Sequence, residues 1–144
     1  MKSPLARVLD FAVARSKEAH AFFKVWTPQE EGPEIQALFT QFAAAERGRV
    51  EMLSRMIPDE LVGKTVNVSG LSDCLVELKE PPRLTRLEAV RLAIQRKHRI
   101  ADLYDRIAKL EGEACSFFHA MAEEDRRTMC ALEEYAKRLA ADNE

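Results

Sequence analysis

Hydrophobic residues recur along four stretches of this chain at alternating intervals of three and four residues. This spacing places them on one face of a helix, as in helices that pack into bundles. The pattern predicts four long helices, over residues 4–26, 33–56, 86–110 and 113–141. Ser3 and Pro4 suit the start of the first helix, and Thr85 with Glu88 has the spacing of a capping box at the start of the third.

The connection between the second and third helices, residues 57–84, is much longer than the other two connections. Antiparallel neighbouring helices need only a short link, so we expect this connection to cross the length of the bundle. The predicted fold class is therefore all-α: a four-helix bundle of two helical hairpins joined by a long crossover, forming a single domain over residues 1–144.

Polar residues interrupt the hydrophobic stripe near the middle of each helix. The six interruptions are Ser16, Glu46, Arg49, Lys97, Asp125 and Thr128. Buried charges are costly unless they are paired, so we expect Arg49 and Lys97 to lie within ion-pair distance of Glu46 or Asp125, in one polar layer. The alternative is that the helical phase is wrong by one residue; some of these side chains then reach solvent, and Glu124 takes the place of Asp125.

The two halves of the chain repeat one helical pattern. Adding 81 to positions in the first helix maps Ala12, Ser16 and Phe23 onto Ala93, Lys97 and Tyr104. Adding 79 in the second helix maps Phe39, Glu46, Arg49 and Leu53 onto Phe118, Asp125, Thr128 and Leu132. We therefore expect two hairpins of common pattern.

Four motifs resemble those of the rubrerythrin branch of the ferritin-like superfamily. The segments "FAVARSKEAHAFF" and "LAIQRKHRIADLY" resemble the family's "AIxxExxAxxFY", and "FAAAERGRVEML" and "MAEEDRRTMCAL" resemble its "LAxxExxHxxxL". The resemblance covers nearly the whole chain and implies a ferritin-like bundle. In that family a Glu from each odd helix and a Glu-x-x-His from each even helix together bind two iron or manganese ions.

The resemblance also implies that most of the metal ligands are missing. Ser16 and Lys97 stand at the two odd-helix Glu positions, and Arg49 and Thr128 stand at the two His positions. Hydroxyl groups are poor ligands for a hard divalent ion, and Arg and Lys offer no lone pair. We therefore expect no metal and no other cofactor, and Glu46 and Asp125 are the best remaining candidates if iron or manganese binds through an altered ligand set.

Histidines elsewhere offer a second route to a metal site. His20 lies one turn from Ser16, His98 adjoins Lys97, and His119 precedes Glu123 by one turn. Scattered histidines are more often surface or hydrogen-bonded core residues, so a relocated metal site is the less favoured alternative.

Net charge, cysteine spacing and the lack of long apolar stretches argue against several classes of protein. The net charge is -2 with both signs interspersed, which argues against nucleic acid as a partner. Cys74, Cys115 and Cys130 form no CxxC pair, which argues against disulfides, against thiolate metal sites and against the rubredoxin-type iron site of full-length rubrerythrins. No stretch has the length and apolarity of a signal peptide or a membrane span, so we expect a cytoplasmic protein without a membrane partner.

Two functional hypotheses follow. The favoured one is a rubrerythrin-related helical protein that has lost the di-iron site and serves as a binding or structural module, expected to dimerise through an exposed helical face and to have no enzymatic activity. The alternative is a rubrerythrin-like di-metal oxidase or peroxidase, or an iron-handling protein, with altered ligands. A bundle unrelated to ferritins leaves the repeat and the crossover unexplained. No catalytic residue and no protein partner is assigned.

Overall fold

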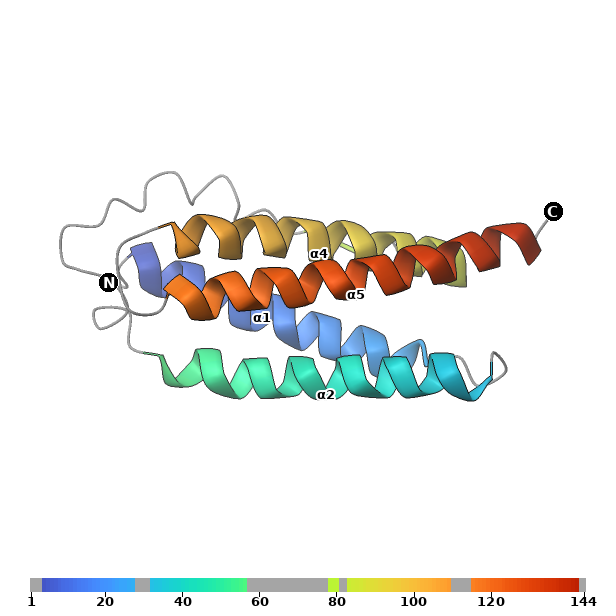
Figure 1. The fold of residues 1–144 in the computed structure, drawn as a ribbon, viewed down its shortest axis with the longest axis horizontal. Helices are drawn as coiled ribbons and strands as arrows, with labels where there is room; N and C mark the ends of the chain where they lie inside the picture. Colours follow the sequence, from blue (N-terminus) through green and yellow to red (C-terminus); the bar gives the residue numbers. More distant parts are fainter. Residues whose placement is uncertain (1–3, 28–31, 57–77, 81–82, 110–114, 143–144) are drawn as a thin grey trace. The chain divides into compact units, whose positions relative to one another are not determined.

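The computed structural model describes residues 4–27, 32–56, 78–80, 83–109 and 115–142, and these residues form four helices. They are α1 (Pro4–Val25), α2 (Pro33–Arg55), α4 (Arg86–Ala108) and α5 (Cys115–Asp142), labelled as in Figure 1. The described residues contain no strand, which confirms the all-α prediction. Each helix end lies within about two residues of its predicted position, the usual uncertainty of helix boundaries. None of the described helices is both long enough and apolar enough to cross a membrane.

Local sequence explains where α2 and α4 begin. Gly32 has φ +96°, a backbone conformation that suits glycine, and Pro33 follows at the first helical position. At the start of α4 the Thr85 hydroxyl accepts a hydrogen bond from the Glu88 amide, and the Glu88 carboxylate accepts one from the Thr85 amide, both at 3.1 Å. This confirms the predicted capping box. The predicted cap Ser3 lies outside the described residues.

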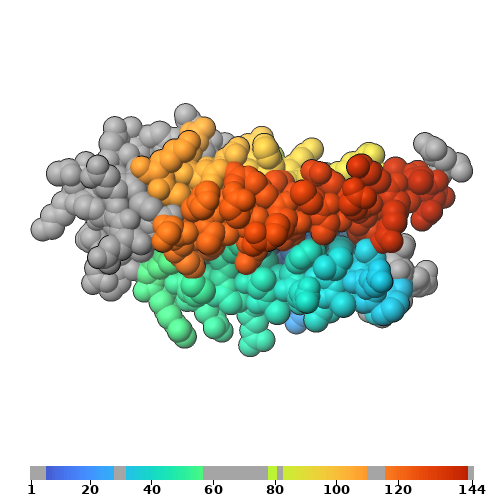
Figure 2. All heavy atoms as spheres, in the orientation of Figure 1, coloured from blue at the N-terminus to red at the C-terminus, as the bar shows by residue number. Residues whose placement is uncertain are grey.

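The chain divides into two compact units, Met1–Pro58 and Asp59–Glu144. The first unit holds α1 packed against α2, and the second holds α4 packed against α5. In each unit the two helices run antiparallel as a hairpin (Figure 1). In the space-filling view, side chains fill the space between the ribbons of α4 and α5 (Figure 2).

Aromatic contacts show that the two hairpins share one register. In the first unit the rings of Phe23 and Phe39 meet edge-on with centroids 5.4 Å apart. In the second unit the rings of Tyr104 and Phe118 lie 5.9 Å apart. Adding 81 to the α1 residue and 79 to the α2 residue converts the first pair into the second. The internal repeat read from the sequence is therefore a structural repeat, and equivalent positions of the hairpins can be compared directly.

The hydrophobic stripe predicted for each helix is largely buried. Its fully buried large side chains are Phe23, Phe39, Leu53, Tyr104, Ile107, Phe118, Leu132 and Tyr135. Burying a side chain of this size contributes about 1.5–3 kcal/mol, so these residues account for much of the packing energy. Trp26 is half-buried just after α1, and its amide donates to the Phe22 carbonyl at 2.9 Å.

The segment that enters α4 is tied to the middle of that helix. Arg96 donates from Nε and Nη2 to the Leu78 carbonyl, at 2.9 and 2.7 Å. Because Arg96 lies about 15 Å along the helix from Arg86, the Leu78 carbonyl lies beside the middle of α4 rather than beside its first turn. Most of the predicted crossover over residues 57–84 lies outside the described residues, and its course stays a prediction.

Candidate functional site

The six polar positions predicted from the sequence are buried. Their exposed fractions are 2% for Ser16, 3% for Glu46, 4% for Arg49, 4% for Lys97, 0% for Asp125 and 7% for Thr128. Within the described part of the chain, these are the buried polar and charged residues. Glu124 is half-buried, so the alternative helical phase, in which it replaces Asp125, is wrong.

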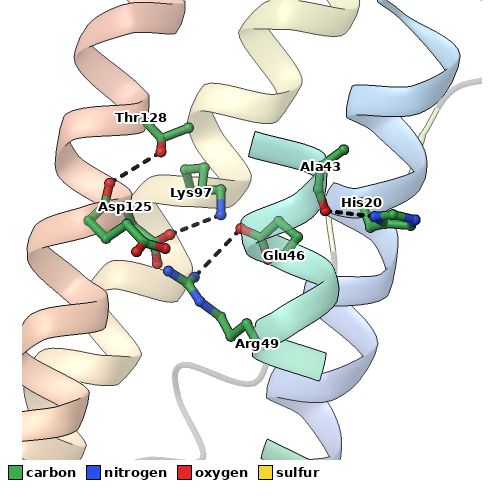
Figure 3. Close-up of polar contacts among 8 residues, drawn as sticks. His20, Ala43, Glu46, Arg49, Lys97, Asp125 and Thr128 are labelled. Atoms are coloured by element: carbon green, nitrogen blue, oxygen red, sulfur yellow. Dashed lines mark hydrogen bonds and ion pairs between the residues drawn. The ribbon is translucent and has the colours of Figure 1, made fainter. Parts of the chain in front are cut away.

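In the second unit, Lys97 of α4 and Asp125 of α5 form a buried ion pair. The Lys97 ammonium donates to Asp125 Oδ1 at 2.9 Å, and the two side chains are 5% and 1% exposed (Figure 3). The distance is that of a charge-assisted hydrogen bond, about twice as strong as one between neutral groups. Each charge therefore offsets much of the cost of burying the other.

In the first unit, the buried pair lies within one helix. Arg49 Nη1 is 3.6 Å from Glu46 Oε1, one turn apart on α2, and both side chains are 4% exposed (Figure 3). The hydrogen bond from His20 of α1 to the Ala43 carbonyl, 2.8 Å long, sets the helices in register, so Ser16 lies level with this pair. The prediction that Arg49 and Lys97 pair with Glu46 or Asp125 is confirmed within each hairpin.

The buried hydroxyl of Thr128 is engaged by its own helix. Thr128 Oγ1 donates to the Glu124 carbonyl at 3.2 Å, a bond to the preceding turn that satisfies a hydroxyl inside a helix. This contact uses the hydroxyl proton at the position where the resemblance implies a metal-binding histidine.

The donor set does not fit a di-metal centre. Each hairpin offers one buried carboxylate, and in each hairpin a fixed cation already contacts it. Iron and manganese sites of this class use four carboxylates and two histidines. Across the described helices, no group of three or more His, Cys, Asp or Glu side chains is placed to hold a metal.

The three histidines occupy separate settings. His20 is half-buried and uses Nδ1 to donate to the Ala43 carbonyl (Figure 3). His98 is exposed, with Nε2 3.8 Å from Asp102 Oδ2 one turn along α4. His119 is exposed on α5. Among the described residues no group of three or more His, Cys, Asp or Glu side chains is placed to hold a metal, and the relocated metal site stays an untested alternative.

Two surface features were not predicted. In the second unit, Arg126 bonds to Asp105 and donates from Nη1 to Glu123 Oε1 at 2.6 Å. The hydrogen bond to Asp105 is the main cause that raises the pKa of Arg126 above its ordinary value. This pairing was not predicted because it depends on the register between two helices, which the spacing of residues along a single helix does not contain.

The second feature is a groove of about 510 Å³ on the first unit, formed by α1 and α2. The lining residues that matter for its chemistry are His20, Lys24, Thr40, Arg47, Gly48 and Glu51. The repeat offsets of 81 and 79 were the signal that could have found it, because they align Lys24 and Arg47 with two members of the Arg126 cluster.

No protein-family model, curated protein or solved structure matches this chain.

Proposed function

We propose that this chain is a ferritin-like helical protein that has lost its di-metal centre and serves as a binding or structural module. One observation carries the proposal. The two carboxylates left at ligand positions are both held by cations, Asp125 by Lys97 at 2.9 Å and Glu46 by Arg49 at 3.6 Å.

Charge explains why these pairs oppose a metal. The two carboxylates and two cations sum to zero without any bound ion. A divalent cation placed at either carboxylate would lie within a few ångströms of a buried positive charge, where the low dielectric strengthens repulsion. Binding would also require the carboxylate to exchange its present partner for the metal, which leaves that partner buried and unpaired.

The alternative is a rubrerythrin-like di-metal oxidase or peroxidase, or an iron-handling protein, in which Glu46 and Asp125 bind metal with unconventional partners. The observation in its favour is that both carboxylates are buried at equivalent positions of the repeat. In the favoured proposal the module works in the cytoplasm as a homodimer, without nucleic acid or membrane, and its protein partner is not assigned.

Elemental analysis of protein purified without chelators or affinity metals separates the two proposals. We expect iron, manganese and zinc far below one atom per chain. Near-stoichiometric metal that is lost in Glu46→Ala or Asp125→Ala would contradict the proposal and favour the enzyme. Glu134→Ala, which removes an exposed carboxylate from α5, is the matched control and should leave the metal content unchanged in either case.

A further inference from the structure

The shared register allows one surface position to be compared in both hairpins. The offsets of 81 and 79 place Lys24 at the position of Asp105, Arg47 at that of Arg126, and Ala44 at that of Glu123. The arginine is thus common to both hairpins, and its two neighbours differ in charge and in size.

In the second unit this arginine is neutralised by the protein itself. Arg126 bonds to Asp105 from the neighbouring helix and to Glu123 one turn earlier on its own helix. A guanidinium group presents its donors in a planar fork that suits carboxylate and phosphate oxygens. In the second hairpin the arginine at this position therefore binds two carboxylate side chains of the protein itself.

In the first unit both of those oxyanions are gone. Lys24 brings a second positive charge where Asp105 stands, and Ala44 is too short to reach Arg47. Lys24 and Arg47 are exposed and both line the groove of about 510 Å³. Small residues, Ala44 and Gly48, line the groove where the second unit has the longer residues Glu123 and Arg127, and a Cβ placed on Gly48 would meet no atom within 4 Å.

His20 adds a polar group to the same groove. Its Nδ1 donates to the Ala43 carbonyl, so Nε2 can donate to an anion only when the ring is protonated. Glu51 is the one carboxylate among the groove residues, and it reduces the positive charge without removing it.

We infer that this groove binds an oxyanion of about two negative charges, such as a phosphate group or a dicarboxylate, between Lys24 and Arg47. The external anion takes the place that Asp105 and Glu123 fill around Arg126 in the second unit. The inference rests on the proposed binding role and names a class of ligand for it.

The test is an NMR titration of the whole protein with inorganic phosphate and, separately, with malonate, at an ionic strength held constant with sodium chloride. We expect saturable shifts at the residues that line the groove. Lys24→Ala with Arg47→Ala should weaken binding at least tenfold. Lys17→Ala with Arg55→Ala is the matched control, because it removes the same charges from exposed positions of α1 and α2 outside the groove, and it should bind like the natural protein.

Two further variants test the comparison between the hairpins. Lys24→Asp with Ala44→Glu rebuilds the arrangement of the second unit around Arg47, so it should abolish binding while the helix content stays unchanged. Glu51→Gln should tighten binding because it removes a like charge. The stronger of the two probes identifies whether phosphate or carboxylate is preferred.

The inference is overturned if the shifts do not saturate, if both double alanine variants lose the same affinity, or if Lys24→Asp with Ala44→Glu still binds. Such a result would not refute the proposed loss of the metal centre. Elemental analysis tests that proposal at the buried Glu46 and Asp125, whereas the titration tests exposed residues.

Discussion

Lys97 and Asp125 show how strongly the contribution of a charged residue to stability depends on its burial. The Lys97 and Asp125 side chains are 5% and 1% exposed, whereas those of Lys137 and Glu134, which pair within α5, are both 76% exposed. Solvent weakens the exposed pair, which contributes about 0–1 kcal/mol at most. The buried pair contributes little net stability when intact, but loss of one partner leaves the other charge without compensation.

We predict that Asp125→Ala lowers the free energy of unfolding by about 3–5 kcal/mol, because it leaves the Lys97 ammonium buried without its carboxylate. Urea unfolding followed by circular dichroism measures the change. Glu134→Ala, the exposed control, should cost less than about 1 kcal/mol. Lys97→Met combined with Asp125→Leu should recover most of the lost stability. Equally small losses in Asp125→Ala and Glu134→Ala would contradict the buried ion pair.

The start of α4 shows how a local motif sets the end of a helix. Thr85 and Glu88 exchange hydrogen bonds between side chain and backbone across one turn. The hydrogen bond from the Thr85 amide, followed by that from its hydroxyl, lowers the pKa of Glu88 below its ordinary value of 4.5. A carboxylate whose pKa is lower in the folded state stabilises that state when it is ionised.

We predict a pH-dependent contribution from this capping box. The stabilisation by ionised Glu88 is complete above pH 4.5 and is lost as the pH falls through the lower pKa of the folded protein. The stability difference between the natural protein and Glu88→Gln should therefore be largest near neutral pH and shrink on acidification. Thr85→Ala removes the hydroxyl but keeps the backbone amide that is the main cause of the lowered pKa, so in that background Glu88→Gln should retain most of its pH-dependent effect. If the stability difference between the natural protein and Glu88→Gln instead grew as the pH fell, the lowered pKa of Glu88 in the folded protein would be contradicted.

Helix positions and their buried faces could be predicted because they depend on residues close together in sequence. The three-and-four spacing placed Glu46, Lys97 and Asp125 on buried faces, and the Thr85 to Glu88 spacing identified a cap. The Arg126 cluster and the groove could not be found in this way, since each needs the alignment of two helices. Only the repeat carried that alignment, and the register of Phe23 with Phe39 was needed to interpret it.

For the whole molecule, the ferritin-like proposal requires the two hairpins to come together as one four-helix bundle. The resemblance implies that a di-metal centre draws one Glu or one Glu-x-x-His from each of four helices. Each hairpin by itself supplies half of those positions. The single-domain, crossover-linked bundle therefore stays a prediction, and a restored metal site is a direct test of it.

We predict that restoring Ser16→Glu, Arg49→His, Lys97→Glu and Thr128→His together creates a site for about two iron or manganese ions per chain, as in the family it resembles. Bound metal should raise the melting temperature, because a ligand that binds the folded state stabilises it. Metal content and thermal unfolding with and without the ion measure the effect. The control restores Lys97→Glu and Thr128→His alone, which confines the new ligands to the second hairpin.

That half-restored control should bind much less metal. Equal binding by the control and the full variant would mean that one hairpin suffices, and no binding by a folded full variant would contradict the ferritin-like arrangement.

The distribution of aromatic residues gives each hairpin its own optical reporter. The single tryptophan of the chain, Trp26, lies in the first unit beside the end of α1, and both tyrosines, Tyr104 and Tyr135, lie buried in the second. Fluorescence excited at a wavelength that tryptophan alone absorbs follows the first hairpin, while tyrosine absorbance follows the second. Coincident transitions from the two signals would indicate that the hairpins melt as one cooperative unit, and separated transitions would resolve the order in which they melt.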